Sequence, residues 1–199
     1  ASNNTAVGKS ALGANTTGAN NVALGALALD ANTTAANNTA VGYASLGANT
    51  TGTANIAMGF GALDANTTAS NNTALGYNAL TTNITGINNT AVGGSALGSV
   101  LNDGNTAVGL SAGAGITSGQ YNTTIGLVSM TAAVYTGSYN SSIGYNANPS
   151  AADSAGQFTL GDANISNLRC NDQSIAALSD SRDKTNVIDS PYGLNFINT

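Results

Sequence analysis

The side chains that most often carry out catalysis are scarce in this chain of 199 residues. It has no histidine, no glutamate, a single cysteine (Cys170), and four basic residues against nine aspartates. Without histidine the usual acid–base group near neutral pH is missing, so neither a Ser-His-Asp triad nor a histidine-ligated metal centre can form. One cysteine supplies neither a disulfide framework nor a zinc ribbon. The composition therefore excludes most enzymes and predicts that no cofactor is bound.

Three aromatic residues and two aspartates remain as candidate binding residues. Tyr43, Phe60 and Tyr77 follow one another at equal intervals in the chain, so a structural repeat of that length would stack their rings. Stacked rings can bind the sugars of a receptor, although packing against a neighbouring chain is their commoner role. Asp30 and Asp64 are two such intervals apart and lack the Gly-Gly-x-Gly-x-Asp pattern of calcium-binding solenoids. We therefore predict no metal site.

The charge and hydropathy of the chain restrict its partners. The net charge is −5 with only 7% charged residues, whereas basic patches supply most of the affinity for nucleic acid. No segment approaches the roughly 18 consecutive apolar residues of a membrane helix. We expect no nucleic-acid binding and no membrane insertion.

A tandem repeat provides the framework that would position these side chains. Its anchor is an aliphatic residue followed by glycine, usually after Asn-Thr-Ala. Successive anchor glycines are separated by the same interval, except that one interval is shorter by a single residue and one is longer by a single residue. The ten anchor glycines are Gly8, Gly25, Gly42, Gly59, Gly76, Gly93, Gly109, Gly126, Gly144 and Gly161. Self-similarity at a fixed period is typical of solenoids.

The repeat unit predicts short strands joined by polar corners. Residues Thr5 and Val7 would face one side of a strand and Ala6 the other, and a unit of this length is enough for two or three such strands. An apolar column follows four residues after each anchor glycine, beginning with Leu12, and Asn-Thr-Thr corners interrupt any helical pattern. We predict an all-β fold, a parallel β-solenoid (β-roll) of about ten 17-residue coils with ladders of Asn and Thr.

Such a thin solenoid should not be stable alone. Its inner core is small, and we expect an alanine-rich outer face to be the next surface to be buried. Alanine faces allow close approach of neighbouring chains, and repeat units need neighbours to bury their cores. We therefore expect an oligomer, most simply a homotrimer.

The repeats "NNTAVGYASLGANTTG" and "NNTALGYNAL" resemble the head repeats of trimeric autotransporter adhesins and related repeats of phage tail fibres. The resemblance covers about three quarters of the chain. It implies a trimer of single-chain β-rolls on an extracellular fibre, with a glycan or protein of the host cell surface as partner. Under this interpretation Tyr43, Phe60 and Tyr77 are candidate receptor-binding residues.

The C-terminal quarter differs in composition. Residues 1–150 carry four charged side chains and residues 151–199 carry nine. We divide the chain into a solenoid shaft (1–150), capping or transition strands (151–178) and a third segment (179–199). This last segment ends in a predicted helix, which begins at Ser190-Pro191.

The motif "LSDSRDKTNVI" at the start of the third segment resembles the beginning of the endosialidase-type intramolecular chaperone, which follows phage tail fibres. The resemblance implies a trimerisation chaperone that many members release by self-cleavage. It places the cleavage serine at Ser179, after Leu178, and its partner lysine at Lys184. A desolvated lysine can serve as the base for a serine; the alternative is a solvated charged turn. At most, therefore, the chain performs one single-turnover cleavage.

Three functions follow from the sequence. The first is the trimeric shaft of a phage tail fibre, located on the virion and used for host attachment. The second is a trimeric adhesin of a bacterial surface. The third is an ice-binding solenoid, suggested by the paired threonines at 16–17, 33–34, 50–51 and 67–68; adjacent threonines point to opposite faces, which weighs against it.

Overall fold

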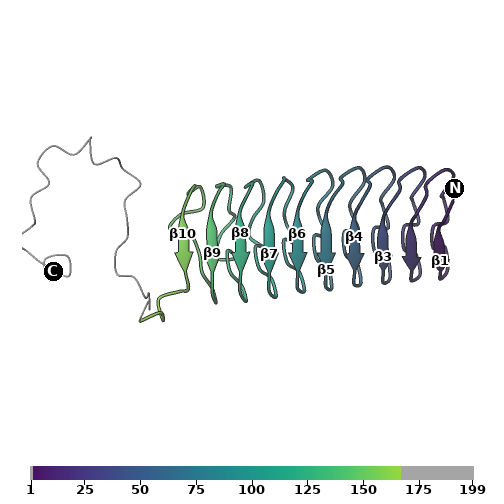
Figure 1. The fold of residues 1–199 in the computed structure, drawn as a ribbon. Helices are drawn as coiled ribbons and strands as arrows, with labels where there is room; N and C mark the ends of the chain where they lie inside the picture. The colour runs from purple at the N-terminus through teal and green to yellow at the C-terminus, as the bar shows by residue number, and fades with distance from the viewer. Residues whose placement is uncertain (1, 167–199) are drawn as a thin grey trace, which may run out of the picture. The chain divides into compact units, whose positions relative to one another are not determined.

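The computed structural model describes residues 2–166 as a stack of coils around one narrow core (Figure 1). The coils contribute ten strands of three residues each. They are β1 (Thr5–Val7), β2 (Val22–Leu24), β3 (Thr39–Val41), β4 (Ile56–Met58), β5 (Thr73–Leu75), β6 (Thr90–Val92), β7 (Thr106–Val108), β8 (Thr123–Ile125), β9 (Ser141–Ile143) and β10 (Phe158–Leu160). The strands form a single sheet in sequence order. The predicted all-β parallel solenoid is therefore confirmed.

Each strand pairs in parallel and in register with the equivalent residues of the next coil. Thr39 pairs with Ile56, and Ile56 with Thr73, so that each step is one full period of the repeat. The step between β6 and β7 is one residue shorter and the step between β8 and β9 one residue longer, yet both leave this register intact. The length differences are thus absorbed outside the strands. With about 4.8 Å between strands, nine steps extend about 43 Å.

The prediction of two or three strands per coil is wrong, because each coil has a single strand. The remaining residues run through turns, and their backbone amides still bond to the next coil. Leu29, for example, donates its N–H to Ser45 O at 3.1 Å, and Leu46 donates to Ala62 O at 3.0 Å. Hydrogen bonding between coils therefore continues outside the strand, so the coil needs no second regular strand.

The prediction of an alanine-rich outer face is also wrong. The central alanine of the strand points inward, and Ala23, Ala40 and Ala57 are fully buried. The flanking Thr and aliphatic residues point outward: Leu24 is 48% exposed and Met58 45%. Alternation fixes that neighbours face opposite sides; the narrow interior selects the small side chain for the inside.

The predicted second apolar column is buried and forms the thickest part of the core. Leu29, Leu46, Leu63, Leu80 and Leu97 are fully inaccessible. These leucines also have φ angles between 50° and 53°, a left-handed conformation that costs a non-glycine residue roughly 1–2 kcal/mol. Burial of a leucine side chain returns about 1.5–3 kcal/mol, so the corner is stable despite its backbone.

Buried asparagines form two ladders along the solenoid, as the sequence predicted. In the first ladder, at the residue before each strand, the side-chain oxygen accepts from the backbone of the next coil: Asn72 N–H donates to Asn55 Oδ1 at 2.9 Å. In the second, amides bond to each other: Asn32 Nδ2 donates to Asn15 Oδ1 at 2.9 Å. The second ladder ends at Asn83, because Val100 takes the next position in the core.

The described part of the expected transition segment (151–178) continues the solenoid. Strand β10 pairs in register with β9, with Phe158 opposite Ser141. The remaining residues of that segment, and the whole of 179–199 with its predicted helix, lie outside the described residues.

Candidate functional site

The three candidate aromatic residues form a continuous stack on the surface. The ring centroids of Tyr43 and Phe60 lie 5.2 Å apart with planes 14° from parallel, and those of Phe60 and Tyr77 lie 5.4 Å apart at 15°. The three side chains are 49%, 50% and 59% exposed. Their regular spacing in the sequence therefore does bring them together, as expected from the repeat.

The anchor glycines position these rings. Gly42 and its equivalents up to Gly144 have φ angles between 121° and 141°, which turn the chain sharply out of the strand and place the next residue at the surface. The residues at this position make one row along the solenoid, which we call the aromatic column. Its members are Lys9, Ala26, Tyr43, Phe60, Tyr77, Gly94, Leu110, Leu127 and Tyr145.

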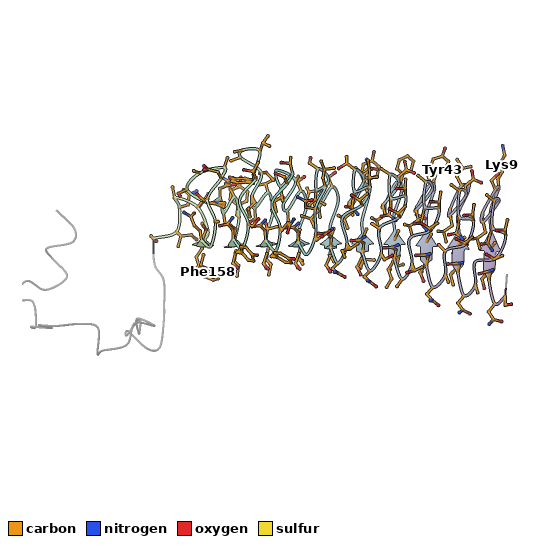
Figure 2. The ribbon with its side chains drawn as sticks, turned by 90° about the horizontal axis from the view of Figure 1, so that it is seen from above. Lys9, Tyr43 and Phe158 are labelled. Atoms are coloured by element: carbon orange, nitrogen blue, oxygen red, sulfur yellow. The ribbon has the colours of Figure 1, made fainter. Side chains whose placement is uncertain are left out.

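A second surface, which the sequence analysis did not single out, is the outer face of the sheet. Two residues per strand point outward, and the larger of them are Val7, Val22, Leu24, Ile56, Met58, Val108, Ile125, Phe158 and Leu160, all between 38% and 66% exposed. We call this surface the sheet face. Figure 2 shows Phe158 of the sheet face on one side of the solenoid and Lys9 and Tyr43 of the aromatic column on the other.

A second tyrosine pair was also missed. The rings of Tyr121 and Tyr139 stack at 5.3 Å, and both residues have positive φ angles. They occupy the corner position that holds Asn20 and Asn37 in earlier coils, where Asn20 Nδ2 donates to Asn37 Oδ1 at 3.3 Å. The signal in the sequence was their position two residues before a strand, in line with those asparagines.

The two aspartates do not form a joint site. Asp30 and Asp64 belong to alternate coils, and the coil between them contributes Gly47, whose position lies against the Asp64 carboxylate. Burial raises the pKa of Asp64 above its usual value. Among residues 2–166 no three His, Cys, Asp or Glu side chains are grouped as a metal ion would require. Over the same residues no helix is long and apolar enough to span a membrane.

The threonine corners use their hydroxyl groups within the solenoid. Thr16 Oγ1 donates to Thr33 O at 2.9 Å, and Thr50 Oγ1 donates to Thr67 O at 3.0 Å. These hydroxyls are therefore engaged with the backbone of the next coil rather than presented to water, which weighs against ice binding at these corners.

Ser179 and Lys184, the pair for possible self-cleavage, lie outside the described residues, as does Cys170. Comparison of the chain with family models, with curated proteins and with solved structures gives no match.

Proposed function

We propose that the chain is part of the shaft of an extracellular attachment fibre, a phage tail fibre, in which three copies pack through their sheet faces. The observation that carries this proposal is the exposed apolar side of a parallel sheet. All-parallel sheets occur almost only where both faces are covered. Here the inner face covers the solenoid core, and the outer face exposes large aliphatic residues such as Leu24 and Met58 to solvent.

The extent of the sheet face supports a partner of the same length. Exposed aliphatic or aromatic residues occur from β1, with Val7, to β10, with Phe158 and Leu160. A contiguous apolar surface of this kind marks an interaction site. A second copy of the chain repeats at the same coil spacing, so its coils match this face along the whole shaft without a change of register.

Two further features favour a fibre. No charged side chain occurs among the residues of strands β1 to β10, so close packing of identical sheet faces buries no charge. The resemblance of the repeats to trimeric adhesin heads and tail fibres supports three copies, and the "LSDSRDKTNVI" motif favours the phage fibre over a bacterial adhesin.

A pair of matched double variants tests the assembly. Leu24→Lys with Leu75→Lys places two charges on the sheet face, whereas Leu110→Lys with Leu127→Lys places the same charges on the aromatic column. By light scattering we expect about 58 kDa for the unmodified chain, three times 19.4 kDa, and the same mass for the aromatic-column variant. The sheet-face variant should dissociate to monomers or aggregate, because identical charges would meet across the threefold axis.

Circular dichroism of each sample separates loss of assembly from loss of fold. A monomeric mass for the unmodified chain at micromolar concentration would contradict the trimer. An intact trimer carrying both sheet-face lysines would show that another surface holds the copies together.

A further inference from the structure

The aromatic column has one ring face that is both free and accompanied by a cation. Within the stack the faces of Tyr43, Phe60 and Tyr77 cover one another at 5.2 and 5.4 Å. The stack ends at Ala26 on one side and at Gly94 on the other. These small residues leave the outer faces of Tyr43 and Tyr77 uncovered by the next coil.

The two ends of the stack differ in what lies beyond the small residue. Beyond Gly94, Leu110 leans over the gap, with its Cδ1 only 3.1 Å from the place of a Cβ on Gly94. Beyond Ala26 is Lys9, the sole basic side chain among residues 2–166. Lys9 has no ion-pair partner within the described residues. Figure 2 shows Lys9 and Tyr43 projecting from the same side of the solenoid.

These residues outline a slot that is one coil high. Ala26 forms its floor, the free face of Tyr43 forms one wall, and Lys9 stands at the other. Since Lys9 and Tyr43 are two coils apart, their backbones are separated by about 10 Å, twice the strand spacing. That distance leaves room for one ring of a sugar lying parallel to Tyr43.

We propose that this slot binds a pyranose sugar bearing a carboxylate. The apolar C–H face of the pyranose would lie on the Tyr43 ring, and its carboxylate would accept a charge-assisted hydrogen bond from Lys9 Nζ. The proposal names the ligand class for the attachment role proposed above and rests on it. Packing through the sheet face leaves the slot accessible, because Tyr43 lies on the opposite side of the solenoid.

The local charge limits the ligand to a single acidic unit. Apart from Lys9, the charged residues of 2–166 are all aspartates, including Asp30 on the coil of Ala26. A polyanion would be repelled by them, whereas one carboxylate beside Lys9 would not. An exposed ion pair contributes up to about 1 kcal/mol, which corresponds to a preference of about fivefold for the acidic sugar.

Two probes that differ at one carbon test the proposal: methyl β-D-glucuronide and methyl β-D-glucoside, titrated by NMR into the full chain at low salt. We expect saturable binding with a preference of about fivefold for the glucuronide. Tyr43→Ala should weaken both probes about tenfold. Lys9→Ala should abolish the preference, and Lys9→Arg should retain it, because the guanidinium also bonds to carboxylates.

Filling the slot provides the sharpest variant. Ala26→Tyr should extend the stack by one ring, keep the thermal midpoint and abolish binding of both probes. The matched control, Gly94→Tyr, extends the opposite end of the stack and should leave binding unchanged. Undiminished binding to Ala26→Tyr, or equal affinity for the two probes, would overturn the proposal.

Light scattering on the same samples keeps this test separate from that of the fibre. All groups of the slot come from one chain, so binding can be scored whatever the oligomeric state. A trimer that binds neither probe would refute the slot and leave the fibre standing, whereas a monomer that binds the glucuronide would do the reverse.

Discussion

At the scale of single residues, the inward-facing asparagine before each strand does the work that a charged or apolar residue could not. Asn55 is fully buried, and its amide has partners on both sides. Oδ1 accepts from Asn72 N–H at 2.9 Å, and Nδ2 donates to Ala69 O at 2.8 Å. An amide offers both a donor and an acceptor without charge, which explains why asparagine recurs at this position in nearly every coil.

We predict that Asn55→Ala strongly destabilises the solenoid. The substitution leaves the N–H of Asn72 and the carbonyl of Ala69 without partners in a dry interior, at about 1–3 kcal/mol for each group. The free energy of unfolding, measured by urea denaturation, should fall by roughly 2–5 kcal/mol.

The control for this prediction is Thr68→Ala, which removes an exposed side chain from the same repeat. Its effect should stay within about 0.5 kcal/mol, as for most surface substitutions. Equal effects of the two variants would show that the asparagine ladder contributes little beyond side-chain volume.

At the scale of the coil, the anchor glycine decides how closely the strands stack. Gly76 has a φ of 140°, and a Cβ there would lie 2.6 Å from the carbonyl group of Gly93 in the next coil. No side chain fits without separating the coils. The glycine is thus required by both its backbone angle and the contact between coils.

We expect Gly76→Ala to weaken the solenoid by about 2–5 kcal/mol, the sum of an unfavourable φ and an overpacked contact. Thermal unfolding followed by circular dichroism measures the change. Gly94→Ala is the matched substitution: its φ is ordinary and its nearest neighbour is the flexible end of Leu110. That variant should unfold within a few degrees of the unmodified chain, so similar midpoints for the two would refute this role of the anchor glycine.

The repeat, the parallel register and the buried leucine column were predictable from the sequence because they follow from spacing alone. Which side of the strand faces inward was not. Thr39 and Val41 alternate with Ala40 in a way that fits either orientation, and the assignment depends on the thickness of the coil, to which every residue of the repeat contributes. The single strand per coil likewise follows from turn residues such as Leu46, whose positive φ is unusual for its type.

The candidate site divides in the same way. The stack of Tyr43, Phe60 and Tyr77 follows from the period, since a residue type repeated once per coil must lie above itself. Its location opposite the sheet face depends on the turn at Gly42 and its equivalents, which spacing does not reveal. The partner role of Lys9 required knowing that Ala26 leaves the ring of Tyr43 uncovered.

At the scale of the whole molecule, the described solenoid is close to one-dimensional. Each coil contacts only its two neighbours along the sheet, so the stability of the stack should be a sum of terms for coils and for contacts between them. Removal of one complete coil should then shorten the stack without changing its structure.

Deletion of residues 56–72 tests this expectation. It removes one period and joins Asn55 to Thr73, so that Thr39 of β3 would pair with Thr73 of β5 in the register that both strands already use. The asparagine ladder also closes, because Asn89 would follow Asn55. The aromatic column loses Phe60, and Tyr43 would stack directly on Tyr77, which leaves the slot at Ala26 in place.

We expect this variant to keep the circular dichroism spectrum of the unmodified chain, to form the same oligomer and to bind the glucuronide probe, with only a modest drop in thermal midpoint. Deletion of half a coil, residues 56–64, is the control. It joins Asn55 to Ala65 and places corner residues where the strand must be, so buried and exposed positions no longer alternate correctly. That chain should fail to fold. If both deletions are tolerated equally, contacts between equivalent positions of successive coils do not determine the structure; if neither is tolerated, the stack is more cooperative than a sum over neighbouring coils allows.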